Sequence, residues 1–147
     1  MPSAQEVSIL LVEDDPGHAR LIEKNLRRSN ITNQLIVAED GQKALDYLFG
    51  QGEYAAKDPA SPLLVLLDLN LPVLDGYQVL KRMKENAHTK RIPVIILTTT
   101  DDTREVSRCY DLGCNVYITK PVDYEHFSEA IRKIGLFLSV VTIPDGD

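Results

Sequence analysis

Side chains that can bind a metal ion and a phosphoryl group follow four apolar runs of this sequence. Glu13-Asp14-Asp15 come after the first run and Asp68 after a later one, while Thr98-Thr99-Thr100 and Thr119-Lys120-Pro121 end two more. Carboxylates gathered at one place repel one another, and a bound cation relieves that repulsion. Because Mg²⁺ prefers hard oxygen ligands and retains water, it fits such a cluster better than zinc or copper.

Asp68 is the residue whose setting is hardest to explain without a function. It follows "LLVLL" (63–67), and an unpaired charge next to so apolar a run is costly. A carboxylate can attack phosphorus and form an aspartyl-phosphate. A divalent ion and a lysine ammonium would then neutralise the charge on the phosphoryl oxygens. Asp68 is therefore the candidate nucleophile, with Lys120 as the candidate cation.

Short apolar runs recur along the chain, rich in Val, Ile and Leu and without strict alternation, at residues 8–12, 34–38, 63–67, 94–98 and 116–119. This pattern is typical of parallel strands that are buried on both faces. Segments with helical spacing of apolar residues lie between and after these runs, at 16–28, 41–49, 76–85, 103–112 and 124–138. The alternation predicts a flavodoxin-like, doubly wound α/β fold, with a five-stranded parallel sheet, five helices and an extended C-terminal tail.

Such a fold would bring the chemical groups together. In open parallel sheets, ligands bind beyond the carboxyl ends of the strands, near the point where the strand order reverses. The acids, hydroxyls and lysine named above stand at those ends. Asp15 and Pro16 also fit the cap and first turn of a helix, so we expect Asp15 to cap rather than to bind metal. Gly113 is the predicted end of the helix over 103–112.

Composition limits the classes of protein that remain. A chain of 147 residues with 44% hydrophobic and 26% charged residues is typical of one soluble globular domain. A net charge of −6 does not favour a general nucleic-acid binder. Cys109 and Cys114 have no second pair beside them, so neither a disulfide framework nor a zinc site is expected. With no signal peptide and no apolar run near the ~20 residues of a membrane helix, we expect a cytoplasmic protein with no membrane partner.

Four motifs together resemble the receiver domain of bacterial two-component response regulators, namely "LLVEDD", "LLDLNLPVLDG", "VIILTT" and "YITKP". The 30 positions from Asp68 to Thr98 and the 52 from Asp68 to Lys120 are spacings that this family shows. The resemblance covers roughly residues 8–136. It implies a single receiver domain over 1–147, with a C-terminal extension at 137–147.

The resemblance also implies roles for individual residues. Asp68 matches the phosphoacceptor, and four residues match the Mg²⁺ site, namely Glu13, Asp14, Asp68 and Asn70. The phosphoryl-binding and switch positions match Thr98, Thr99, Lys120 and Tyr117. Asp68 and Lys120 match the catalytic pair. The implied protein is a signalling switch rather than an enzyme with a separate substrate, and it catalyses its own phosphorylation and dephosphorylation.

Three further stretches are similar to stand-alone response regulators that are paired with phytochrome-type histidine kinases. They are the long connection at 50–62, "CYDLGCNVYITKP", and the apolar tail ending in "VTIP". The similarity implies a sensor histidine kinase of that type as partner. It also implies a homodimer through the region from the fourth helix to the C-terminal tail, and no DNA-binding domain. The alternative to dimerisation is that the apolar tail folds back onto its own domain.

Each candidate site residue also has a purely structural interpretation. On this interpretation, Asp68 caps a strand end, the acids at 13–15 cap a helix and compensate its dipole, and Thr98 is simply a residue that favours β-structure. Lys120 alone would be an ordinary surface lysine, and Tyr117 a half-buried packing residue.

Three other functions also remain open. A Mg²⁺-dependent phosphohydrolase with an Asp nucleophile usually carries a second carboxylate two positions on, where this chain has Asn70. A flavin- or nucleotide-binding module needs a phosphate loop rich in Gly, Ser or Thr after the first strand, whereas "EDDPGHAR" is acidic. A degenerate receiver would only bind partners, which the complete set of site residues does not favour.

Overall fold

The computed structural model describes residues 8–28, 32–54, 63–99 and 102–119. The strands are β1 (Ser8–Val12), β2 (Leu35–Ala38), β3 (Leu63–Leu67), β4 (Val94–Thr98) and β5 (Val116–Thr119). The helices are α1 (Pro16–Arg28), α2 (Gly41–Phe49), α3 (Gly76–Glu85) and α4 (Thr103–Leu112), with a short 3-10 turn η1 (Gly52–Tyr54). Within these ranges, no helix has both the length and the apolar character needed to span a membrane. The helix expected at 124–138 and the tail at 137–147 lie outside the described residues.

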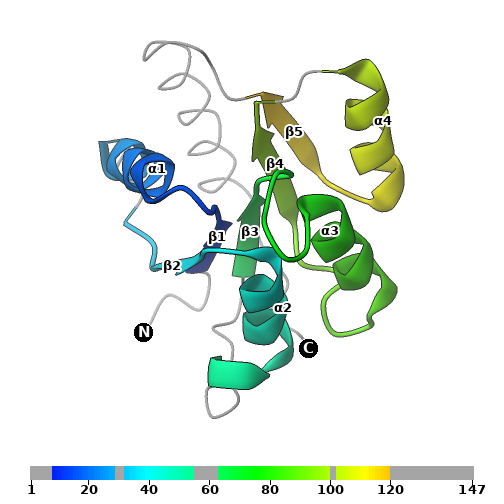
Figure 1. The fold of residues 1–147 in the computed structure, drawn as a ribbon, viewed down its shortest axis with the longest axis horizontal. Coiled ribbons are helices and arrows are strands. Elements are labelled where there is room, and N and C mark those ends of the chain that lie inside the picture. The colour runs from blue at the N-terminus through cyan, green and yellow to red at the C-terminus, as the bar shows by residue number, and fades with distance from the viewer. Residues whose placement is uncertain (1–7, 29–31, 55–62, 100–101, 120–147) are drawn as a thin grey trace, which may run out of the picture.

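The five strands form one parallel sheet in the order β2-β1-β3-β4-β5 (Figure 1). The chain leaves β1 toward one edge to form β2 and returns to the other side of β1 to form β3. The strand order therefore reverses between β1 and β3, and Val12 of β1 pairs with Leu67 of β3 at the carboxyl ends. The predicted doubly wound α/β fold is confirmed, with four of the helices in the described part.

Both faces of the sheet are covered, which explains why the strands do not alternate. Every residue of β3 and β4 is buried. Val65 and Leu67 belong to the core beneath α2, α3 and α4, while Leu64 and Leu66 belong to a second core beneath α1. Since burying one aliphatic side chain is worth about 1.5–3 kcal/mol, these central strands dominate the stability of the sheet.

The helices begin and end where the sequence predicts. The Asp15 Oδ1 accepts hydrogen bonds from the main-chain N–H groups of Gly17, at 2.8 Å, and His18, at 3.2 Å, so Asp15 caps α1. Asp75 and Gln78 form a capping box at the start of α3. Gly113 ends α4, and its N–H donates to the Cys109 carbonyl.

Two glycines let helices approach the loop that follows β3. A Cβ on Gly76 would lie 2.4 Å from the Asp68 carbonyl oxygen and 2.7 Å from the Leu69 Cα. A Cβ on Gly41 would lie 2.0 Å from the Leu74 carbonyl oxygen. The loop 69–75 is thus held between the first residues of α2 and α3, and Gly76 sets the position of the Asp68 backbone.

Replacing Gly76 tests this close approach. Because the atoms that a new methyl group would meet are backbone atoms, we expect Gly76→Ala to lower the free energy of unfolding by about 2–3 kcal/mol, measured by urea denaturation. Gly17→Ala is the control, since a Cβ there meets only the Asp15 side chain at 3.1 Å. It should stay within about 1 kcal/mol of wild type. Equal stability of Gly76→Ala and wild type would contradict the packing described.

Cys109 on α4 and Cys114 just before β5 are free thiols, buried in the core beneath α2, α3 and α4. Burial raises the pKa of Cys109 to about 12 and the pKa of Cys114 to about 11. Both thiols therefore stay protonated in the folded protein at pH values where unfolded cysteines, with a pKa of about 8.5, ionise.

Stability should consequently fall with rising pH. Above pH ~9 the unfolded chain binds fewer protons at these thiols than the folded chain does, so the free energy of unfolding decreases as pH rises. The thiol contribution is complete below pH ~8.5 and is lost as pH rises through about 11 to 12. Urea midpoints at pH 8, 9 and 10 measure the slope. A double Cys109→Ala/Cys114→Ala variant should show a shallower slope, and identical slopes would refute the assignment.

Candidate functional site

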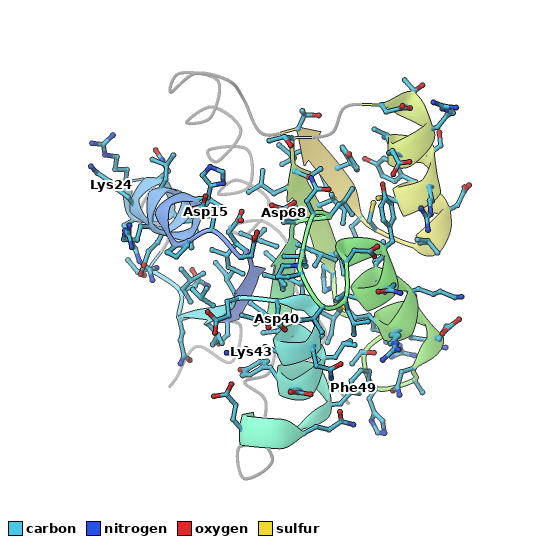
Figure 2. The ribbon with its side chains drawn as sticks, in the orientation of Figure 1. Asp15, Lys24, Asp40, Lys43, Phe49 and Asp68 are labelled. Carbon is cyan, nitrogen blue, oxygen red and sulfur yellow. The ribbon has the colours of Figure 1, made fainter. Side chains whose placement is uncertain are left out.

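Three carboxylates meet at the carboxyl ends of β1 and β3. Glu13 and Asp14 follow β1, and Asp68 follows β3; one side-chain oxygen from each lies within 4.8 Å of those of the other two. Glu13 is 3% exposed and Asp68 is 8% exposed, whereas Asp14 is exposed to solvent. Figure 2 shows Asp68 and the neighbouring Asp15 at the same edge of the sheet. The predicted convergence of the acids is therefore present.

The chemistry of this cluster suits a divalent cation. Three carboxylate oxygens at this separation repel one another in a partly dehydrated setting, which an ion with two charges would relieve. All donors are hard oxygens, as Mg²⁺ requires. Since Asp14 is exposed, an ion held there would remain reachable by water and by an incoming phosphate.

Asp68 is oriented by two hydrogen bonds to the same oxygen. Its Oδ1 accepts from the main-chain N–H of Asn70 at 3.0 Å and from the hydroxyl of Thr98 at 3.0 Å. Thr98 is fully buried at the end of β4, which pairs with β3. Hydrogen bonds to an ionised carboxylate stabilise the charged form and fix its plane. Thr98 thus contacts the candidate phosphoacceptor directly, beyond its contribution to β4.

Glu13 and Asp15, the first and last acids of the "EDD" triplet, have different roles. Glu13 Oε2 accepts from the Asp15 N–H at 3.2 Å, and the Glu13 N–H donates to the Ala38 carbonyl at 3.0 Å. These bonds hold Glu13 at the buried side of the cluster. Asp15 is occupied as the cap of α1 and does not belong to the three-acid group. This agrees with the interpretation of Asp15 as a cap.

The remaining predicted residues fall into two groups. Thr99 is exposed directly after β4, and Tyr117 is half-buried in β5 against the core beneath α2, α3 and α4. The Tyr117 N–H donates to the Tyr110 hydroxyl at 3.1 Å, which links β5 to α4. Lys120 and Pro121 lie outside the described residues, so their predicted positions stay predictions.

The structure also reveals two residues near Asp68 in the chain whose roles were not predicted, one in the loop 69–75 and one at the start of α3. Gly76 supports the backbone of Asp68, and the Asp75-Gly76 pair was a visible turn signal for it. Val73 has a positive φ of 68° and is 75% exposed. No sequence signal indicates this, because valine ordinarily favours extended backbone.

Comparisons with known proteins agree with this geometry. Residues 9–132 match the response regulator receiver domain family. The chain is 42% identical to the response regulator Rcp1 of Synechocystis over 137 residues, which cover 92% of each chain. The Mn²⁺-bound form of Rcp1 has a TM-score of 0.86 and 40% identity, covering 94% of this chain and 99% of that one.

Two further solved structures are similar over nearly the whole chain. A response regulator receiver domain from Rhodospirillum rubrum is 58% identical, with a TM-score of 0.85, covering 95% of this chain and 98% of that one. The phosphorylated cyanobacterial phytochrome response regulator RcpA is 38% identical, with a TM-score of 0.86, covering 95% of this chain and 99% of that one. Neither the phosphohydrolase nor the flavodoxin-like binding module is supported. With its acidic cluster and its parallel sheet, the chain belongs to the response regulator receiver domain family of two-component signalling proteins.

Proposed function

We propose that Asp68 accepts a phosphoryl group from the phosphohistidine of a sensor histidine kinase, in a reaction that requires Mg²⁺. The observation that carries this proposal is the group of three carboxylates within 4.8 Å, one of which is hydrogen-bonded to a buried threonine hydroxyl. Glu13, Asp14, Asp68 and the main-chain carbonyl of Asn70 would hold the ion. When bound, the ion supplies charge neutralisation for the phosphoryl oxygens. The Mn²⁺-bound form of Rcp1 supports a divalent ion in this class of protein.

The protein side chains perform the transfer by position and charge. An Asp68 oxygen attacks phosphorus while the bond from phosphorus to the histidine nitrogen breaks, and the freed imidazole keeps the electron pair and takes up a proton. The bonds from Asn70 and Thr98 hold the carboxylate in place before attack. Lys120 is proposed to supply an ammonium group for the transferred oxygens, and Thr99 to border them. Water later attacks the phosphorus of the aspartyl-phosphate, the bond from phosphorus to the Asp68 oxygen breaks, and inorganic phosphate leaves, which restores the Asp68 carboxylate.

The signal arises because the Thr98 hydroxyl has two alternative acceptors. In this structure it donates to Asp68 Oδ1. After phosphorylation it would donate to a phosphoryl oxygen, and Tyr117 would follow from its half-buried position on β5. Such a change needs only a difference in contact energy between the two states. The surface formed by α4 and β5 would present the altered state to a partner.

The similarity to the phytochrome response regulator RcpA supports a phytochrome-type kinase as the phosphoryl donor. We propose that residues 1–147 act as a single receiver domain in the cytoplasm. We also propose that the chain forms a homodimer through the region from α4 to the C-terminal tail. The exposed Tyr110 on α4 supports a contact on that face.

Phosphorylation at Asp68 can be tested with a small donor. Incubation with acetyl phosphate and Mg²⁺ should add one phosphoryl group, seen as an increase of about 80 Da in the intact mass. Asp68→Asn should abolish the increase, because the amide is not a nucleophile. Asp75→Asn is the matched control in the same loop; it retains a helix cap and should be labelled like wild type. Labelling of Asp68→Asn at the wild-type level would disprove the assignment.

Removal of one acid tests the metal site. In metal-free buffer, Asp14→Asn should raise the free energy of unfolding by about 1 kcal/mol, because it relieves repulsion in the cluster. Addition of Mg²⁺ should raise the Tm of wild type and have little effect on Asp14→Asn.

Asp15→Asn is the control one residue away, since an asparagine cap preserves α1. Its Tm should respond to Mg²⁺ as the wild-type Tm does. An unchanged Mg²⁺ response in Asp14→Asn would remove Asp14 from the site.

A further inference from the structure

Val73 stands in an unfavourable backbone conformation at the tip of the loop that follows Asp68. Its φ is 68°, and it is the central residue of a tight turn closed by the Leu74 N–H donating to the Pro72 carbonyl at 2.8 Å. A three-residue turn with positive φ is a rare and strained type. A β-branched residue in this region is an outlier, because its side chain crowds the backbone. Asparagine or glycine would fit the turn with less strain.

The turn is held in place by the residues on either side of it. Leu71 and Leu74 pack against the core beneath α2, α3 and α4. The Gly76 N–H donates to the Leu69 carbonyl at 3.0 Å, which closes the base of the loop. Val73 is thus left on the outside with 75% of its surface exposed, the largest exposure among the exposed large hydrophobic residues described.

Strain and exposure together distinguish Val73 from an ordinary surface valine. A single exposed apolar side chain is common and needs no explanation. Here the same residue also strains the backbone, and its own domain covers little of its side chain. Strained residues of this kind gather at functional sites.

The location indicates which molecule would cover this side chain. Val73 lies five positions after Asp68, in a loop tied to Asp68 through the Asn70 N–H. Exposed polar residues stand on both sides of Val73 within the loop, namely Asn70 and Asp75. An apolar contact surrounded by polar groups is the usual arrangement of a protein interface. A donor domain that brings phosphohistidine to Asp68 would approach the loop that carries Val73, whereas a small donor need not.

We propose that Val73 docks into an apolar surface of the histidine kinase domain that carries the phosphohistidine. The proposal rests on the proposed function, because it assumes that Asp68 receives the phosphoryl group. Val73 would then determine how fast the kinase transfers the group, and would not affect transfer from a small molecule. Its identity, rather than the turn alone, would contribute to the choice of kinase.

Val73→Thr and Val37→Thr provide a matched pair for the test. Each replaces one methyl group of an exposed valine by a hydroxyl, and Val37 lies on β2 with 45% exposure. The donor is the phytochrome-type kinase that, after autophosphorylation with ATP, phosphorylates wild type fastest within a panel. Val73→Thr should lower the transfer rate by about tenfold, the effect of losing one well-buried apolar contact. Val37→Thr should leave it unchanged.

Acetyl phosphate separates this inference from the proposed function. Its labelling rate should be the same for both valine variants and wild type. If wild type took no label from acetyl phosphate, the proposed function would fail. If acetyl phosphate labelled normally and the kinase treated Val73→Thr like wild type, only the docking role would be wrong. An equal loss of labelling with both donors would overturn the docking role and place Val73 in the phosphoryl-transfer site. Altered sedimentation with an unchanged transfer rate would also overturn it and assign Val73 to self-association.

A second variant tests whether the valine side chain is kept at this strained position because it contacts the kinase. Val73→Asn should increase the folding equilibrium constant about fivefold, because asparagine tolerates positive φ better than valine. It should nevertheless slow kinase transfer as Val73→Thr does. A variant that is less stable than wild type, or that receives the phosphoryl group faster, would contradict the inference.

Discussion

The constraint on which this structure depends is the repulsion among three carboxylates that a parallel sheet brings together. Because β1 and β3 are neighbours in register, Val12 and Leu67 end side by side and the acids that follow them must converge. Two of the three are almost fully buried, which makes the repulsion stronger than it would be in water. A sheet selected only for stability would place neutral residues there.

The surroundings keep the repelling groups in place. The hydroxyl of Thr98 and the N–H of Asn70 both contact Asp68 Oδ1. The backbone of Asp68 is fixed in turn by the close approach of Gly76 at the start of α3. Every residue of β3 and β4 is buried, which restrains the strand ends that carry Asp68 and Thr98. Because the frame around Asp68 is rigid, a change in charge at that carboxylate would shift the Thr98 hydroxyl between its two acceptors.

Much of this arrangement follows from patterns that are local in the sequence. The apolar runs predict β3 and β4 because strands covered on both faces need aliphatic residues at every position. The acids at strand ends predict the cluster because parallel strands share one edge. The hydrogen bond from Thr98 to Asp68 was not predicted, because it depends on side-chain positions on two strands. The strained turn at Val73 was also missed, since neighbouring contacts override the preference of valine for extended backbone.

We expect Asp14 to share one divalent ion with Asp68, the carboxylate that reacts. Anomalous diffraction from crystals soaked in Mn²⁺ tests it most directly, because Mn²⁺ accepts the oxygen ligands of Mg²⁺ and scatters strongly enough to be located. We expect one strong peak in contact with carboxylate oxygens of both Asp14 and Asp68. A peak bound elsewhere, or no peak at this edge of the sheet, would contradict it.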